Sequence, residues 1–263
     1  LTAVAVVYFI VPAKARWVVL LAASLIFYAK AGLSYLPFMM GTAAITYVGA
    51  RMISGIHERA ALALASEERK DEKKAIRRKE KRSARKVMWI VVAVVLAYLI
   101  YTKFARKVAA LFFSAASGGS PALTVIIPLG ISYYTFSTIG YVLDVYWKRY
   151  PAEKNFFRYL LYVCYFPHIL QGPIARYDRL GFQFRELHYF DYRRVCFGVQ
   201  LALWGVFQKL VIADRFGPFV TNVLANYQNA SGSLLLFTMF LYAVQLYTDF
   251  SGCVDIARGM SMP

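Results

Sequence analysis

The chain of 263 residues is 59% hydrophobic and 17% aromatic, and its mean hydropathy is +0.48. These values exceed those of ordinary soluble domains, so the composition predicts an all-α polytopic membrane protein, with room for roughly eight spans of about 20 residues each. The formal charge of +17 does not indicate a nucleic-acid partner, because the basic residues alternate with apolar segments and gather in one loop.

The first part of the sequence predicts several apolar helices. Trp17–Ala29 continues a short apolar start, Leu33–Ile53 is long enough to span a membrane, and Val87–Tyr101 forms the next span. Lys103–Phe113 mixes cations with aromatic residues, which favours a helix at the membrane interface. Small residues that allow close packing of membrane helices occur in the second segment at Gly41, Ala43, Ala44, Gly49 and Ala50.

A basic stretch, residues 54–86, separates two of these spans. It carries twelve Lys or Arg residues against six Asp or Glu residues, which predicts a cytoplasmic loop. Like charges four residues apart, such as Lys70 and Lys74, would weaken an isolated helix. Anionic lipid headgroups would offset that repulsion, so we expect the loop to lie on the inner leaflet.

Two breaks interrupt the apolar sequence that follows. Leu123–Trp147 is broken by Pro128-Leu129-Gly130, and the next apolar segment is broken by Pro167 and again by Gly172-Pro173. A proline frees a backbone carbonyl, which in a membrane must be satisfied by protein or by a water-lined cavity. Two broken helices in succession therefore favour a polar cavity within the membrane.

The last two predicted helices are Tyr192–Ala213 and Leu234–Gly259. Gln245 and Asp249 lie four residues apart on the second helix, hence on one helix face, with Gly252 in the following turn. This face is a candidate lining for a substrate path.

Charged side chains at the centre of a membrane helix cost about 2.5–3.5 kcal/mol each, so they are candidate functional residues. Three positions also suit structural roles. Asp144 lies among cations at the end of a span, Lys209 can form an ion cluster with Asp214 and Arg215, and His168 suits a hydrogen-bonded structural position. The full set of polar candidates is Asp144, His168, Gln171, Arg176, Lys209, Asp214, Gln245, Asp249 and Asp255.

The sequence lacks the motifs of several common enzyme classes and the cysteine spacing of metal sites. The chain has no GxSxG, HExxH, Walker or GxGxxG motif. The sequence therefore gives no support for a hydrolase, a metalloprotease, or a nucleotide-driven or dinucleotide-binding protein. Its three cysteines, Cys164, Cys196 and Cys253, are far apart and lack metal-ligand spacing, so we expect buried thiols and no metal site.

Five ordered stretches resemble the membrane-bound O-acyltransferase family, in its bacterial alginate O-acetyltransferase branch. They read PLGISYYTF, YVLDVYW, YFPHILQGPIARY, LWGVFQKLVIADR and QLYTDFSGCVDIARG. The resemblance extends over most of the chain, and the basic stretch is its least family-like part.

The resemblance implies a fold and a reaction. The expected fold is a single transmembrane domain over residues 1–263, a ring of tilted, partly broken helices around a tunnel. The implied reaction moves an acyl group, expected to be acetyl, to a hydroxyl of an exported polysaccharide. The implied donor is acetyl-CoA or an acyl carrier on the cytoplasmic side. No bound cofactor is expected; membrane lipids and an extracytoplasmic polysaccharide-modifying protein are the expected partners, and the cell membrane is the expected location.

The resemblance also assigns residues. Asp249 matches an acidic position near the tunnel, although Thr248 stands where an aromatic residue is usual. The family's histidine base follows the last of the five stretches, so we expect it beyond Pro263, in a longer protein that this chain represents in part, and we expect this part alone to be inactive. The expected tunnel-lining residues are Pro128, Gly130, Tyr133, Gln171, Gly172, Pro173, Gln245 and Ser251.

Other functions remain open at this point. D-alanyl transfer to teichoic acid is a related reaction in the same family. A transporter or lipid flippase would also use broken helices and intramembrane carboxylates, although no internal repeat is present. A non-catalytic membrane partner of an acyltransferase is the third alternative.

Overall fold

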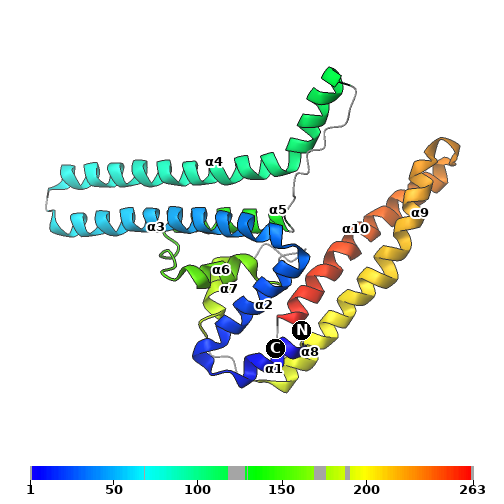
Figure 1. Ribbon diagram of the computed structural model, residues 1–263, viewed down its shortest axis with the longest axis horizontal. Coiled ribbons are helices and arrows are strands. Elements are labelled where there is room, and N and C mark those ends of the chain that lie inside the picture. The colour runs from blue at the N-terminus through cyan, green and yellow to red at the C-terminus, as the bar shows by residue number, and fades with distance from the viewer. Residues whose placement is uncertain are drawn as a thin grey trace. The chain divides into compact units, whose positions relative to one another are not determined.

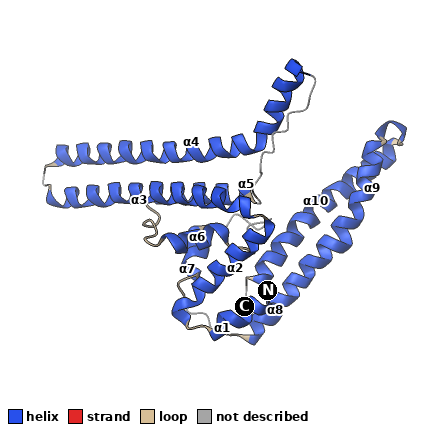
Figure 2. Cartoon of the chain, in the orientation of Figure 1, coloured by secondary structure: helices blue, strands red, loops and turns tan. Residues whose placement is uncertain are grey.

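The computed structural model describes residues 2–67, 69–117, 128, 130–168, 176–186 and 190–261. Within these ranges every regular element is a helix and no strand occurs (Figure 2), which confirms the all-α prediction. The chain divides into two compact units. The larger unit comprises Val11–Ile169 and Ile174–Glu186, and the smaller unit comprises Leu1–Ile10, Leu170–Pro173 and Leu187–Pro263.

The larger unit contains six α-helices and two short 3-10 turns in its described part (Figure 1). The turns are η1 (Ala13–Ala15) and η2 (Leu33–Tyr35), and the helices are α2 (Arg16–Ala31), α3 (Leu36–Ser66), α4 (Lys70–Ser117), α5 (Ile131–Tyr146), α6 (Phe156–Cys164) and α7 (Tyr177–Gln183). The helices α3 and α4 lie side by side as a long antiparallel hairpin (Figure 1). The other helices of this unit are short.

The smaller unit contains α1 (Thr2–Ile10) and two long helical arms. The first arm runs from α8 (Tyr192–Phe207) through a π-helical segment, η3 (Gln208–Ala213), into α9 (Asp214–Ala225), and a turn, η4 (Tyr227–Asn229), leads to α10 (Gly232–Met260). The first arm is longer than the predicted helix Tyr192–Ala213, because the π segment and Pro218 interrupt regular hydrogen bonding without ending the helix.

Three helical segments among the described residues are long and apolar enough to cross a membrane: Lys70–Phe104, Tyr192–Ala225 and Gly232–Met260. A fourth span arises if Arg16–Ala31 and Leu33–Ser66, bent by 113° at their junction, count as one. The membrane prediction is therefore confirmed, and the described residues contain fewer such spans than the length of the chain permits. One reason is that α5 and α6 have 16 and 9 residues, short of the about 20 that cross a bilayer.

The hairpin of α3 and α4 depends on small residues, as the sequence predicts. A β-carbon added to Gly49 would lie 2.4 Å from a methyl carbon of Val91, so only glycine allows this approach. Ala43 and Ala50 are fully buried beside it. Gly41 differs, because an added β-carbon there would meet nothing within 4 Å.

The basic stretch is helical, which corrects the expectation of a loop whose like charges oppose a helix. Residues 54–66 continue α3 and residues 70–86 begin α4. Tertiary packing supports this helix, because Ala84 is fully buried and Glu80 accepts a hydrogen bond from His57 Nδ1 of α3 at 2.7 Å. Asp71 and Glu72 in the first turn also suit the helix dipole.

Both predicted breaks coincide with helix ends. Gly130 has φ of +68°, a left-handed conformation that glycine adopts without strain, and α5 begins at the next residue. The amide of Ile131 donates to the carbonyl oxygen of Pro128 at 3.3 Å, which satisfies that carbonyl. The helix α6 ends at Cys164, and Pro167 lies in the turn that follows.

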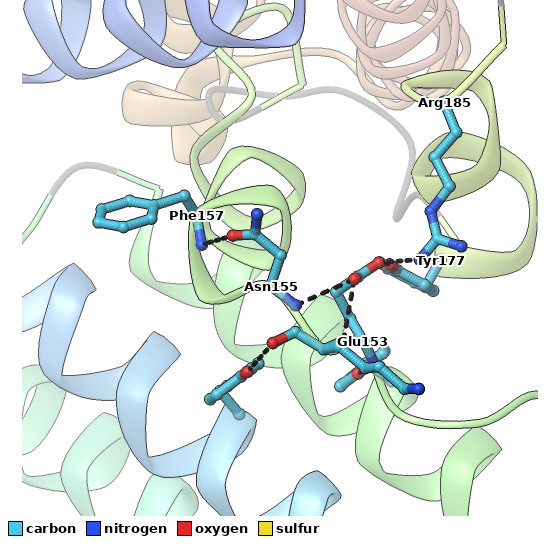
Figure 3. A network of polar contacts seen from close by, with 8 residues as sticks. Glu153, Asn155, Phe157, Tyr177 and Arg185 are labelled. Atoms are coloured by element: carbon cyan, nitrogen blue, oxygen red, sulfur yellow. Dashed lines mark hydrogen bonds and ion pairs between the residues drawn. The ribbon is translucent and has the colours of Figure 1, made fainter. Parts of the chain in front are cut away.

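A buried carboxylate holds the loop between α5 and α6 to α7. Glu153 is 5% exposed, and its carboxylate accepts a hydrogen bond from Tyr177 Oη at 2.6 Å and pairs with the guanidinium of Arg185 (Figure 3). Its other oxygen accepts from the amide of Asn155 at 3.1 Å, and its own amide donates to Tyr141 Oη at 2.8 Å. Burial alone would raise the pKa of Glu153, but these hydrogen bonds and the charge of Arg185 hold that pKa below its ordinary value.

Glu153→Gln is therefore expected to destabilise the protein at neutral pH by about 1.5–3 kcal/mol, the range for hydrogen bonds to a charged group. Because the folded-state pKa of Glu153 lies below its unfolded value, the wild-type advantage is complete above the unfolded pKa, about 4.3, and is lost as the pH falls through the folded pKa. Thermal unfolding in detergent, recorded from neutral to acidic pH, measures this difference. Asp71→Asn, at an almost fully exposed carboxylate, is the control and should change stability little. A Glu153→Gln difference that stays constant down to acidic pH would contradict the assignment.

Candidate functional site

The candidate site lies in the smaller unit, where glycines bring α8 and α10 into backbone contact. A β-carbon added to Gly205 would lie 2.5 Å from the carbonyl oxygen of Gly252, and one added to Gly252 would lie 2.7 Å from the carbonyl oxygen of Gly205. The same holds for Gly259, whose added β-carbon would lie 2.4 Å from the carbonyl oxygen of Gly198. Such contact is typical of membrane helices, whose association depends on close packing rather than on burial from water.

This close approach places Lys209 between two carboxylates. Lys209 belongs to the π-helical segment, and its Nζ forms an ion pair with Asp249 of α10 and lies 3.0 Å from Oδ1 of Asp214. About a third of each of the Lys209 and Asp249 side chains is exposed. A cation shared by two carboxylates offsets half of their charge, and this lowers the cost of carrying them on apolar helices.

Two glutamines adjoin this ion cluster. An added β-carbon at Gly217 would lie 3.2 Å from Nε2 of Gln245, and one at Gly252 would lie 3.2 Å from Cβ of Gln208, so each glutamine packs against a glycine. The Oε1 atoms of Gln245 and Gln208 are buried, and neither has a hydrogen-bond partner among the described residues. A buried amide oxygen without a donor is costly, and each can accept a hydrogen bond from a hydroxyl group.

The predicted site residues divide between the units. Asp249 and Gln245 lie on one face of α10, as expected from their spacing. Ser251 follows Asp249 by two residues, a rotation of about 200°, and so lies on nearly the opposite side of the helix. Pro128, which is buried, and the α5 residues near it belong to the larger unit. Those residues are Gly130, at the start of α5, and Tyr133, which is half-buried in its first turn.

The predicted residues Gln171, Gly172 and Pro173 lie outside the described residues. Asp144 is paired with a cation, as predicted, because its Oδ1 accepts from Arg149 Nη1 at 2.8 Å. The ring of His168 lies 5.4 Å from the ring of Tyr165, centroid to centroid, which is consistent with a structural position.

The pair of Lys209 and Asp214 is predicted from the sequence. The pair of Lys209 and Asp249 is not. The contact surface of α8 is also not predicted from the sequence. A signal for that surface exists in the spacing of Gly198, Ala202 and Gly205, because residues four and seven positions apart share one helix face. The buried thiol prediction holds for Cys164, whereas Cys196 and Cys253 are half-buried.

No metal centre is formed in the part of the chain that the structure describes, because no three His, Cys, Asp or Glu side chains there come together in a way that could hold an ion. The groups that the candidate site presents are charges and amides. Lys209, Asp214 and Asp249 can position and neutralise charge, and the two amide oxygens can orient a hydroxyl.

Comparison with known proteins finds similar proteins with curated names. No protein-family model matches the chain. The chain is 28% identical over 262 residues to the probable alginate O-acetylase AlgI of Azotobacter vinelandii, which covers 97% of this chain and 47% of that protein. It is 26% identical over 293 residues to the peptidoglycan O-acetyltransferase of Helicobacter pylori, covering 97% of this chain and 50% of that protein.

A third relative is the teichoic acid D-alanyltransferase of Bacillus subtilis, which is 28% identical over 153 residues, 57% of this chain and 38% of that protein. All three relatives are members of the membrane-bound O-acyltransferase family, and the chain is similar to them. The chain spans about half the length of the first two of these relatives.

A double-mutant cycle tests whether Lys209 and Asp249 interact as the structure shows. Lys209→Met should destabilise the protein because it leaves two carboxylates without their cation, and Asp249→Asn should destabilise it because it removes one of the two carboxylates that pair with Lys209. The two changes together should cost less than the sum of the single changes, with a coupling energy of about 0.5–3 kcal/mol in unfolding experiments in detergent.

The control cycle combines Lys209→Met with Asp255→Asn, a carboxylate six residues further along α10 that is not paired with Lys209 in the described structure. These changes should be additive within about 0.5 kcal/mol. Additive costs for Lys209 and Asp249 as well would contradict the ion pair.

Proposed function

We propose that the whole protein transfers an acetyl group to hydroxyl groups of an exported polysaccharide or cell-wall polymer. The observation that carries this proposal is the match over 97% of the chain to two relatives that are named O-acetylating proteins, one for alginate and one for peptidoglycan. The donor is a thioester such as acetyl-CoA or an acyl carrier, reached from the cytoplasmic side. The location is the cell membrane.

The reaction joins the hydroxyl oxygen to the acyl carbon and breaks the bond between that carbon and sulfur. The hydroxyl proton passes to a base, and the sulfur leaves as a thiol or thiolate. The family resemblance implies a histidine base, and we assign that role to none of His57, His168 or His188. The contribution of this chain is to bind and orient the hydroxyl.

In this proposal the buried Oε1 atoms of Gln245 and Gln208 each accept a hydrogen bond from a polymer hydroxyl next to the one that reacts, and the proton of the reacting hydroxyl passes to the base. Their lack of a donor among the described residues supports that role, because a site with unpaired acceptors favours a ligand that supplies the donor. The ion pair of Lys209 with Asp249 fixes the helix face that carries Gln245, and so acts on position rather than on the reacting atoms.

A tunnel remains part of the proposal. The residues at the break before α5, Pro128, Gly130 and Tyr133, are proposed to line the tunnel, and Gln171, Gly172 and Pro173 are proposed tunnel-lining residues as well. Transfer across the membrane would require such a path, because the donor is on the cytoplasmic side and the exported polymer is on the other side.

D-alanyl transfer is a second candidate, favoured by the similarity to the Bacillus subtilis D-alanyltransferase. That similarity covers 57% of the chain, whereas the similarity to the two O-acetylating relatives covers 97%. We therefore favour acetyl as the acyl group. A polysaccharide-modifying protein outside the cytoplasm is the proposed partner.

Asp249→Asn in the full-length protein should lower the acetyl content of the polymer by at least about tenfold, because a displaced orienting group costs up to about a hundredfold in rate. The measurement is ester-bound acetate in polymer from cells whose own gene is deleted, with the membrane level of each variant determined by immunoblot. Gln245→Leu, which removes an acceptor, should lower the acetyl content as well.

Asp255→Asn is the matched control, because it makes the same chemical change on the same helix. It should leave acetylation near the wild-type level. Normal acetylation with Asp249→Asn, or equal losses in Asp249→Asn and Asp255→Asn, would contradict the proposed role of this helix face.

A further inference from the structure

The larger unit contains a basic cavity where the carboxyl end of α5 meets the hairpin of α3 and α4. Its volume is about 550 Å³, within the range of small-molecule sites in proteins. The residues that line it come from three segments of the unit. They are His57 and Leu64 of α3, Arg77, Glu80 and Lys81 of α4, and Tyr146, Trp147 and Lys148 at the end of α5.

Cations outnumber acids in this cavity. Arg77, Lys81 and Lys148 each carry a positive charge, and Glu80 is the one carboxylate among the lining residues. Glu80 is nearly buried and already pairs with Lys148 Nζ and with His57 Nδ1. Arg77 and Lys81 have no ion pair with it in the described structure, so the cavity retains positive charge.

Lys148 adopts an unusual backbone conformation at the cavity. Its φ of +60° is the only positive φ of a non-glycine residue among the described residues. Residues other than glycine, asparagine and aspartate rarely adopt this region, and strained positions of this kind cluster at functional sites. The turn is anchored by the Lys148 amide, which donates to the carbonyl oxygen of Val145 at 3.0 Å, and it directs the ammonium group to Glu80.

His57 offers a second polar group. Its Nδ1 contacts Glu80, and its Nε2 is buried without a hydrogen-bond partner among the described residues. With Nδ1 donating, a neutral imidazole presents Nε2 as an acceptor, and a protonated imidazole presents it as a donor. Either state complements a phosphate group, which offers both P–OH and P–O⁻.

We propose that this cavity binds a phosphate group, together with a small apolar or hydroxylated part that packs against Leu64, Tyr146 and Trp147. Arg77, Lys81 and Lys148 supply charge-assisted contacts to the phosphate oxygens. Two sources carry this chemistry: the headgroup of an anionic lipid of the inner leaflet, where the basic stretch is expected to lie, and a soluble phosphate compound. The site is distinct from the ion cluster of Lys209, and its existence does not depend on the proposed acyl transfer.

The test is calorimetric titration of the purified chain in neutral detergent. The probes are dihexanoyl phosphatidic acid, dihexanoyl phosphatidylglycerol, inorganic phosphate and, as the zwitterionic control, dihexanoyl phosphatidylcholine. Saturable binding of at least one anionic probe, tighter than that of the phosphatidylcholine, is expected. Binding of the two anionic lipids alone identifies a headgroup site, and equal binding of inorganic phosphate identifies a soluble source.

Lys148→Asn removes the charge while keeping a residue that tolerates the left-handed conformation, and it should weaken binding by at least about tenfold. The double variant Arg77→Gln with Lys81→Gln should weaken binding to a similar extent. Arg78→Gln with Arg82→Gln is the matched control, because it removes the same charge from exposed neighbours on the same helix. This control should change the affinity by about twofold or less, as screened surface charges do.

Two results would overturn the proposal. One is the absence of saturable binding for every anionic probe. The other is equal weakening by the Arg77 and Lys81 pair and by the Arg78 and Arg82 pair, which would show general attraction to a basic helix rather than a site.

Discussion

The backbone contact between α8 and α10 is the constraint on which the candidate site depends. Gly205 and Gly252 face each other so closely that neither position accepts a β-carbon without displacement of the other helix. This spacing lets Lys209 reach Asp249, and it brings Cβ of Gln208 against Gly252. Without the glycines the two helices would separate, and Asp249 would be left on an apolar helix without its cation.

The charged side chains of the larger unit described above also have partners that satisfy their charge. Glu153 is satisfied by Tyr177, Arg185 and backbone amides, and Asp144 by Arg149. Charged groups on short or broken helices are thus carried in pairs, which reduces the cost of removing them from water. Some buried uncharged acceptors, such as Oε1 of Gln245 in the smaller unit, have no hydrogen-bond partner among the described residues. A ligand that supplies a donor to such an acceptor gains the most binding free energy.

The all-α class, the long apolar helices and both chain breaks could be predicted from composition, length and proline position. The position of Asp249 and Gln245 on one face of α10 could be predicted from helical periodicity alone. The pairing of Asp249 with Lys209 could not, because 40 residues separate them and only the approach of two helices decides it. The helical state of the basic stretch was mispredicted for a related reason: local charge repulsion opposes a helix there, and packing of Ala84 and Glu80 against α3 outweighs it.

The central claim is that the full-length protein transfers an acetyl group to a polymer hydroxyl. The most direct measurement uses membrane vesicles that contain the full-length protein, an acetyl donor labelled in its acetyl group on the cytoplasmic side, and the acceptor polymer on the other side. We expect label in alkali-labile ester linkage to the polymer, in proportion to the amount of protein. Passage of label across the membrane without ester formation would contradict it and would indicate a transporter.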